Sequence, residues 1–264
     1  KNGISPIRAL RLMTLNTATL YNLKGKGGLA PGYKADFIIF DNIESPNIKE
    51  VYHNGQIVAQ NGSMINEIKR KKVSENSTVH IPKNIGESLK KFPKSGKVRV
   101  IGIVEGQILT ENLVFDIENI ENEDIAYLAV IERHGKNGNI SIGLVKGFGI
   151  KKGAIASTVA HDSHNLILMG KSLEDMEFAA KKIAEIGGGF LAVLNNQILS
   201  SVPLKIAGIM SDVKACEISK SMKELDDSSK MLGINISSPF MTLSFLALPV
   251  IPHLKVTDKW LVDV

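Results

Sequence analysis

Residues 161–165 form the densest group of side chains that can do chemistry. His161, Asp162, Ser163, His164 and Asn165 follow one another between the apolar segments 154–160 and 166–169. Histidine and aspartate act as general acids, general bases or metal ligands, and loops at strand ends often carry such groups. One reading is a catalytic loop. The other is a buried hydrogen-bond network that pins a turn, with the aspartate orienting a histidine.

The spacing of the two histidines argues against a metal site formed by this loop alone. His161 and His164 lie three residues apart, so they share a face only if the segment is helical. On a strand, they point to opposite faces. We therefore take His161, Asp162 and His164 as candidate catalytic residues that contact substrate or orient other groups, and Asn165 as a candidate binding residue.

A second polar group ends the apolar segment 126–132, which predicts a strand. Glu132, Arg133 and His134 stand here before Gly135. Successive strand residues alternate between faces, so either Glu132 or Arg133 is expected to point inward. Glu132 and His134 are candidate binding residues, and the alternative is a charged strand end that enters a turn.

None of the remaining motifs indicates a particular reaction. Residues 146–153 are rich in glycine and lysine, but no Gly-Lys-Ser/Thr follows as a phosphate loop requires, so a connecting loop is favoured. No His-x-His, Gly-x-Ser-x-Gly or cysteine pair occurs in the chain. From the residues alone, a catalytic role and a structural role both stay open.

Strands and helices alternate through the second half of the chain, which predicts an α/β or α+β layered domain. Ser172 is the expected N-cap of the helix 173–186, and Gly187 is its expected stop. A long helix is expected over 212–232, capped by Ser211 or Asp212. The expected strands of this part are 98–104, 126–132, 141–145, 166–169 and 190–194, with a tight turn at 195–196.

The first part of the chain is smaller. Ser5-Pro6 begins an expected helix within 4–23. A buried strand is expected at 35–40, and Asn54-Gly55 predicts a hairpin between 50–53 and 56–59. Residues 67–97 are charged and contain two prolines, which is typical of a linker. We therefore expect three segments, 1–66, 67–97 and 98–264.

Composition restricts the partners and the compartment. The net charge is +5, and the basic runs 69–72 and 90–91 lack interleaved aromatics, so nucleic acid is not an expected partner. A single cysteine, Cys216, excludes an intrachain disulfide, and with no signal peptide the cytoplasm is the expected compartment. No apolar run reaches the roughly 20 residues that span a bilayer, so no membrane contact is expected.

Two blocks of sequence resemble the amidohydrolase superfamily. The first covers 9–18 and 29–40 and includes the Pro-Gly-x-x-Ala-Asp signature at 31–36. It is similar to the last helix of the amidohydrolase barrel and the strands that return to a small β-sandwich. The second block resembles the C-terminal domain of microbial adenine deaminases and consists of 130–134, 147–149, 153–157, 161–165, 206–212 and 244–252.

The resemblance implies hydrolysis of adenine to hypoxanthine and ammonia. In that family a binuclear manganese or iron site in the barrel activates water. No metal ligand of that family matches a residue of this chain, so the resemblance implies metals held by a barrel portion absent from it. The resemblance also implies an N-terminal barrel partner and a homo-oligomer.

Two other readings compete with an enzyme that works only with its barrel. The chain can be a structural or oligomerisation module that supports the barrel, or an independent ligand-binding domain. The strands at 35–59 are expected to pair with strands that precede the barrel, and unpaired strand edges promote aggregation. The chain alone is therefore expected to be poorly soluble and inactive.

Overall fold

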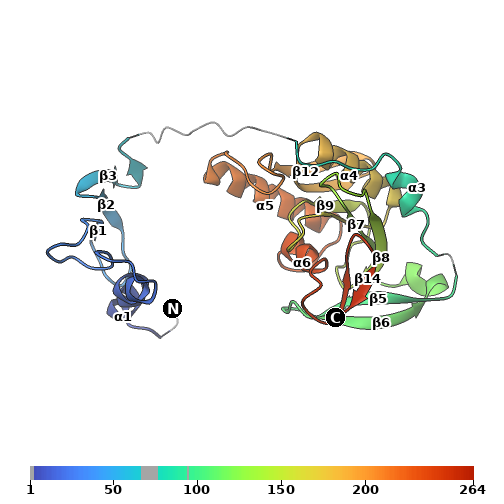
Figure 1. Cartoon of the computed structure of the whole chain (residues 1–264), viewed down its shortest axis with the longest axis horizontal. Coiled ribbons are helices and arrows are strands. Elements are labelled where there is room, and N and C mark those ends of the chain that lie inside the picture. Colours follow the sequence, from blue (N-terminus) through green and yellow to red (C-terminus); the bar gives the residue numbers. More distant parts are fainter. Residues whose placement is uncertain (1–2, 67–76, 94) are drawn as a thin grey trace. The chain divides into compact units, whose positions relative to one another are not determined.

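The computed structural model describes residues 3–66, 77–93 and 95–264, and the chain divides into two units, Lys1–Lys72 and Val73–Val264 (Figure 1). The lysine-rich run at 69–72 and most of the first half of the expected linker lie outside the described residues. The described part of 77–97 belongs to the second unit and contains helix α3, Ile85–Leu89, whose residues Ile85 and Leu89 are buried.

The first unit begins with one continuous helical segment, in which α1 (Pro6–Arg11), a π-helical turn η1 (Leu12–Asn16) and α2 (Thr17–Leu20) follow without a break. Pro6 occupies the first turn as expected, whereas the Ser5 side chain makes no capping hydrogen bond. Three threonines donate back to main-chain oxygens in this segment, for example Thr17 to Leu12. Such bonds compete with regular helix geometry.

A small antiparallel sheet of order β1-β2-β3-β4 completes the first unit. Its strands are β1 (Phe37–Phe40), β2 (Ile48–His53), β3 (Gln56–Gln60) and β4 (Ser63–Met64). Asn54 and Gly55 both have positive φ, +49° and +78°, between β2 and β3. The Asn-Gly hairpin predicted from the sequence is thereby confirmed.

The first unit has almost no core. Of its described residues only Ala18 is a buried hydrophobic residue, while Met13, Leu20 and Leu29 are each more than 70% exposed. An apolar helix face and an apolar strand face that stay open to water are typical of a surface that packs against another protein segment.

The second unit is built on one eight-stranded sheet of order β12-β11-β9-β10-β7-β8-β5-β6. Every neighbouring pair is antiparallel except β5 with β8, which is parallel. The strands are β5 (Lys97–Ile103), β6 (Thr110–Asp116), β7 (Ile125–Ile131), β8 (Ile140–Lys146), β9 (Ala154–Ser157), β10 (Leu166–Gly170), β11 (Gly189–Leu194) and β12 (Gln197–Pro203). A short 3₁₀ segment η2 (Ile117–Asn122) follows β6.

Helices cover both faces of this sheet, as Figure 1 shows. On one face, α3 and α4 (Leu173–Glu185) pack on side chains such as Ala129 and Ile131. On the other face, α5 (Ala215–Met231), α6 (Pro239–Phe245) and the hairpin of β13 (Leu254–Val256) with β14 (Leu261–Asp263) pack on the alternate residues, such as Leu128 and Val130. The expected mixed layered fold is confirmed, and no strand set closes into a barrel within the described residues.

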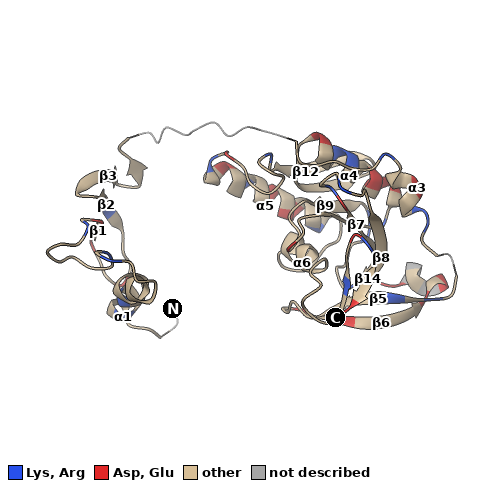
Figure 2. Cartoon of the chain, in the orientation of Figure 1, with Lys and Arg blue, Asp and Glu red and all other residues tan. Residues whose placement is uncertain are grey.

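Helix boundaries follow local chemistry in one case and depart from it in another. The Ser172 hydroxyl accepts a hydrogen bond from the Asp175 main-chain N–H, which confirms the expected N-cap of α4. The long helix begins at Ala215, and neither Ser211 nor Asp212 caps it, because Lys214 occupies the cap position. Lysine, arginine, aspartate and glutamate are interspersed along the elements of each unit (Figure 2).

Candidate functional site

The candidate residues gather where several strands of the eight-stranded sheet end on the same side. We call this region, formed by 132–138, 158–165 and 204–212, the polar edge. Strand β7 ends at Ile131 opposite Leu166, the first residue of β10, and Ser157 at the end of β9 pairs with Ile167. Gly189 at the start of β11 pairs with Pro203 at the end of β12. The segments 132–138, 158–165 and 204–212 therefore leave the sheet at the same edge, although they are far apart in sequence.

Glu132 forms an anchored carboxylate at this edge. Its Oε1 accepts a hydrogen bond from the main-chain N–H of His134, and its Oε2 accepts three more, from residues 136, 137 and 138. Burial alone would raise the pKa of this 4% exposed carboxyl, but the four donors outweigh burial and lower the pKa to about 2. Both oxygens are occupied, so Glu132 shapes the turn that follows β7.

Arg133 ties three of the segments together. Its Nε donates to the His164 carbonyl oxygen, Nη1 donates to the carbonyl oxygen and hydroxyl of Thr78 at 3.0 and 3.3 Å, and Nη2 donates to the Ala207 carbonyl oxygen at 3.1 Å. The side chain is only 1% exposed, and burial lowers its pKa from the usual value. A guanidinium suits this role because its planar fork presents five donors in fixed directions.

Gly208 lets the chain come close to this guanidinium. A Cβ at position 208 would lie 2.8 Å from Arg133 Nη1, and the residue has a φ of +72°. Its carbonyl oxygen accepts the hydroxyl proton of buried Thr158, and the same Thr158 hydroxyl accepts from the Gly189 N–H at 2.7 Å. The 204–212 segment is thus fixed on the arginine and on the end of β9.

The three histidines differ in what they offer to a ligand. His134 is exposed, and its Nε2 lies 2.8 Å from the Ser163 carbonyl oxygen, so Nε2 carries the proton and Nδ1 of the neutral ring is an acceptor. His161 is half-buried and stacks on Phe245, with 4.8 Å between ring centroids. Burial, followed by the nearby Arg133 charge, lowers the pKa of His164, which keeps this half-buried ring neutral at pH 7.

Two buried polar atoms of the loop have no hydrogen-bond partner in the described structure, His164 Nδ1 and Asn165 Oδ1. The Asn165 amide nitrogen lies 3.3 Å from Asp258 Oδ1, and Asn139 contacts the other oxygen of Asp258 at the same distance. His164 also has a positive φ of +49°, which is uncommon for a residue with a side chain. Unpaired buried polar atoms cost free energy, and they often mark a site that another group completes.

The structure therefore brings all six predicted site residues to one edge, with different accessibility. His134 and Asp162 are exposed, His161 and His164 are half-buried, and Glu132 and Asn165 are buried. Strand alternation predicted that one of Glu132 and Arg133 points inward, and the structure buries both side chains. Both residues follow directly after β7, a strand in the middle of the sheet.

Several residues of this site carried no recognisable signal in the sequence. Thr78 lies in the segment expected as a linker, and Asp258 lies close to the C-terminal end of the chain. Thr158 is of a type found in any loop, and Gly208, although part of the block 206–212, is not distinguished within it by its type. These residues are recognised only once distant segments of the chain are known to lie in contact, and a single sequence does not contain that information.

The described residues do not form a metal centre. In 3–66, 77–93 and 95–264, no group of three or more His, Cys, Asp or Glu side chains could hold a metal ion. His134, His161 and His164 share the edge, yet one is bound to a carbonyl oxygen and another stacks on a phenyl ring.

Comparison with known families assigns both units. Residues 1–58 match the amidohydrolase family, and residues 104–264 match the family described as the adenine deaminase C-terminal domain. The second match covers more than half of the chain, and the chain therefore belongs to the adenine deaminase C-terminal domain family. Four of the segments that carry the resemblance lie close together. Segments 130–134, 161–165 and 206–212 meet at the polar edge, and 244–252 contains Phe245, which stacks on His161.

Curated relatives match along the whole chain. The chain is 41% identical over 271 residues to an adenine deaminase of Brucella melitensis biotype 1, covering 99% of the chain and 46% of the relative. It is 42% identical to an adenine deaminase of Lysinibacillus sphaericus, covering 99% and 47%. An adenine deaminase of Petrotoga mobilis is 41% identical, covering 100% and 48%. The chain thus spans about half the length of the curated relatives that it matches.

Proposed function

We propose that this chain is the C-terminal part of a metal-dependent adenine deaminase, in which its polar edge contacts the substrate or the groups around it. The observation that supports this most is the meeting of His134 and residues 161–164 on the Arg133 clamp. Relatives that are 41–42% identical are adenine deaminases, and they supply the proposed reaction. Water oxygen bonds to the purine carbon that bears the amino group, the carbon–nitrogen bond breaks, and ammonia leaves.

The accessible side chains of the edge have defined roles in this proposal. His134 accepts a proton at Nδ1, because its Nε2–H is committed to the Ser163 carbonyl oxygen. Asp162 is exposed in the loop 161–165 and can accept a hydrogen bond from an amino group. Glu132 and Arg133 are positioning residues, because their polar groups are engaged within the protein, whereas Asn165 keeps one unpartnered amide oxygen.

The amidohydrolase match implies a metal-dependent reaction, and we infer a binuclear manganese or iron site. The site is assigned to the portion of the complete protein that corresponds to the other half of the relatives. This barrel portion is the proposed N-terminal partner of the chain. The apolar surface of the first unit, in which Ala18 alone of the described hydrophobic residues is buried, supports such a partner.

A structural module is the second candidate function. The full occupancy of Glu132 and Arg133 by main-chain groups favours it, since such bonds build a rigid edge without any contact to substrate. In this reading the edge supports the barrel or an interface between copies, and its exposed side chains are dispensable for the reaction.

We infer a cytoplasmic protein that does not bind nucleic acid. Cys216 is the single cysteine and is exposed, which suits a reducing compartment. The mixed arrangement of positive and negative residues in Figure 2 supports the absence of a nucleic-acid surface. No helix among the described residues is long and apolar enough to cross a membrane.

The test compares Asp162→Asn and His134→Gln in the complete protein with the control Lys136→Ala, an exposed residue of the neighbouring turn. We expect kcat/KM for ammonia release from adenine to fall by about 100-fold in the first two variants, as for lost acid–base groups, with an unchanged Tm. The control keeps its activity. Unchanged kcat/KM and unchanged Tm in both variants would establish the structural module instead.

A further inference from the structure

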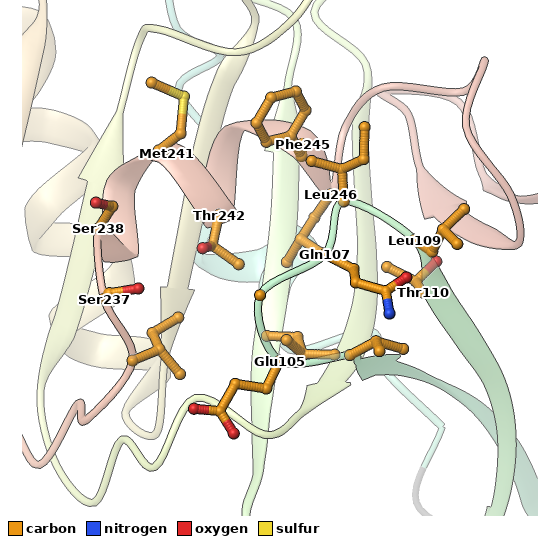
Figure 3. A pocket seen from close by; sticks show the side chains of 15 residues that line it. Glu105, Gln107, Leu109, Thr110, Ser237, Ser238, Met241, Thr242, Phe245 and Leu246 are labelled. Atoms are coloured by element: carbon orange, nitrogen blue, oxygen red, sulfur yellow. The ribbon is translucent and has the colours of Figure 1, made fainter. Parts of the chain in front are cut away.

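A cavity of about 250 Å³ lies between the turn that joins β5 to β6 and helix α6 (Figure 3). Residues 103–110 form one side of it, and residues 236–246 form the other side. In Figure 3, Phe245 and Met241 extend from the helix, and the Gln107 side chain lies across from them. All of the cavity belongs to the second unit.

The residues that line the cavity favour an uncharged ligand. Its walls combine apolar side chains with the hydroxyl of Thr242, the amide of Gln107 and the carboxyl group of Glu105. None of the described residues that line it is lysine or arginine. Phosphate groups are bound chiefly by such cations, so a lining that holds a carboxylate and no cation disfavours nucleotides and favours an uncharged molecule with hydrogen-bonding edges.

The β5–β6 side of the cavity is held in place by a buried lysine. Lys255 is 0% exposed, and its Nζ donates to the Ile108 carbonyl oxygen and to the Thr110 hydroxyl, both at 3.2 Å. Burial lowers the pKa of Lys255 to about 8. The Thr110 hydroxyl also donates to the Leu254 carbonyl oxygen at 2.9 Å, so the wall is anchored on β13.

The cavity is connected to the polar edge through one aromatic stack. The Phe245 ring lines the cavity, and it also stacks on His161 with an interplanar angle of 23°. A ligand ring that packs against Phe245 therefore changes the surroundings of His161. Aromatic walls of this kind bind flat rings by stacking.

We propose that this cavity binds an uncharged bicyclic heteroaromatic base of purine size, and that His161 responds to its occupation. The volume of about 250 Å³ is below the usual range for sites of drug-sized ligands and suits a molecule of about ten heavy atoms. Binding does not depend on the proposed reaction, because it uses residues of the second unit alone.

The experiment measures binding of adenine and hypoxanthine by calorimetry and by NMR of the histidine rings, with the 264-residue chain carrying Leu29→Lys to limit self-association through the first unit. We expect both bases to bind with a Kd below about 1 mM, and adenosine monophosphate to bind at least tenfold more weakly. The His161 ring resonances should shift on adding adenine. Absence of binding at saturating adenine would overturn the proposal, and binding without a His161 shift would overturn its second half.

Three variants separate this cavity from binding elsewhere. Thr242→Trp fills the space, and it should weaken adenine binding at least tenfold, while Ser219→Trp on the exposed face of α5 should leave it unchanged. If Thr242→Trp fails to fold, Gln107→Leu on the exposed turn removes a hydrogen-bonding group instead and should weaken binding about fivefold. Wild-type affinity in the folded cavity variants would overturn the proposed location.

Discussion

Arg133 is a buried cation. Its hydrogen-bond acceptors are three main-chain carbonyl oxygens and a hydroxyl rather than a carboxylate. Neutral acceptors can solvate a guanidinium when several of them are fixed at the right distances, which avoids the cost of burying a second charge. The three segments that supply these oxygens are thereby held together. Arg133 thereby keeps His164 and the 204–212 segment in place.

Replacement of Arg133 should therefore destabilise the second unit strongly. In Arg133→Met the carbonyl oxygens of Thr78, His164 and Ala207 lose their common donor, and we expect a loss of roughly 3 kcal/mol in the free energy of unfolding. Arg99→Met is the control, because Arg99 is 45% exposed and its 3.5 Å pair with Asp263 is at the surface. Urea unfolding measures both, and equal losses in the two variants would refute the clamp.

Glu132 predicts a dependence of stability on acid. Its folded-state pKa of about 2 lies below the ordinary 4.5, so its stabilising contribution is complete above pH 4.5 and is lost as the pH falls toward 2. The glutamine of Glu132→Gln does not titrate, so this variant does not lose stability from protonation of position 132. The stability difference between wild type and variant should narrow by roughly 3 kcal/mol between pH 5 and pH 2, measured by urea unfolding across that range. A constant difference would contradict the anchored carboxylate.

At the scale of elements, the 204–212 segment depends on a glycine where it meets Arg133. Gly208→Ala should cost roughly 2–4 kcal/mol, because it adds a contact of 2.8 Å to a guanidinium on top of a positive φ. Gly106→Ala is the matched control, since its φ of +71° is nearly the same and no heavy atom lies within 4 Å of its Cβ position. It should cost only about 1 kcal/mol. Thermal unfolding would contradict this account if both variants lost the same stability.

Elements with a strong local signal could be predicted from sequence. Helix α4 has a capping serine, an amphipathic pattern and a glycine stop, and it was found within one residue of the expected ends. Strand β9 has four buried residues, and helix α6 has seven residues with Pro239 at its start. Runs this short fit a strand or a helix equally well, and their neighbours in space decide between the two. Neither was predicted.

Some residues of the candidate site could also be predicted from the sequence, and others could not. The polar run at 161–165 was recognisable because its residue types contrast with the apolar segments around it. The partners that fix it, such as Thr78 and the Ala207 carbonyl oxygen, lie more than 40 residues from Arg133 in the chain. They come together only through the order of strands in the sheet, which local patterns do not contain.

At the scale of the whole molecule, the first unit exposes surface that globular proteins normally cover. Strand β1 pairs only with β2 among the described residues, so one edge of the small sheet is open. The exposed apolar side chains of its helix add to this surface. The expected homo-oligomer and the expected barrel partner both stay predictions, and either would cover apolar area.

The chain by itself should therefore self-associate. Light scattering after size-exclusion chromatography should show aggregates, and Leu29→Lys should reduce them, since Leu29 is 73% exposed in the first unit. Val250→Lys, at 67% exposure in the second unit, serves as the control and should leave the aggregates unchanged. A monodisperse monomer of the unaltered chain would contradict the open apolar surface.

The central claim is that this chain supports adenine deamination but needs the rest of the protein for the reaction. The most direct measurement is ammonia release from adenine with added manganese, by the chain alone and by the chain joined to the portion that corresponds to the other half of its relatives. We predict release only by the joined protein. Release by the chain alone would contradict the account, because the edge that carries His134, His161 and Asp162 would then be a complete active site.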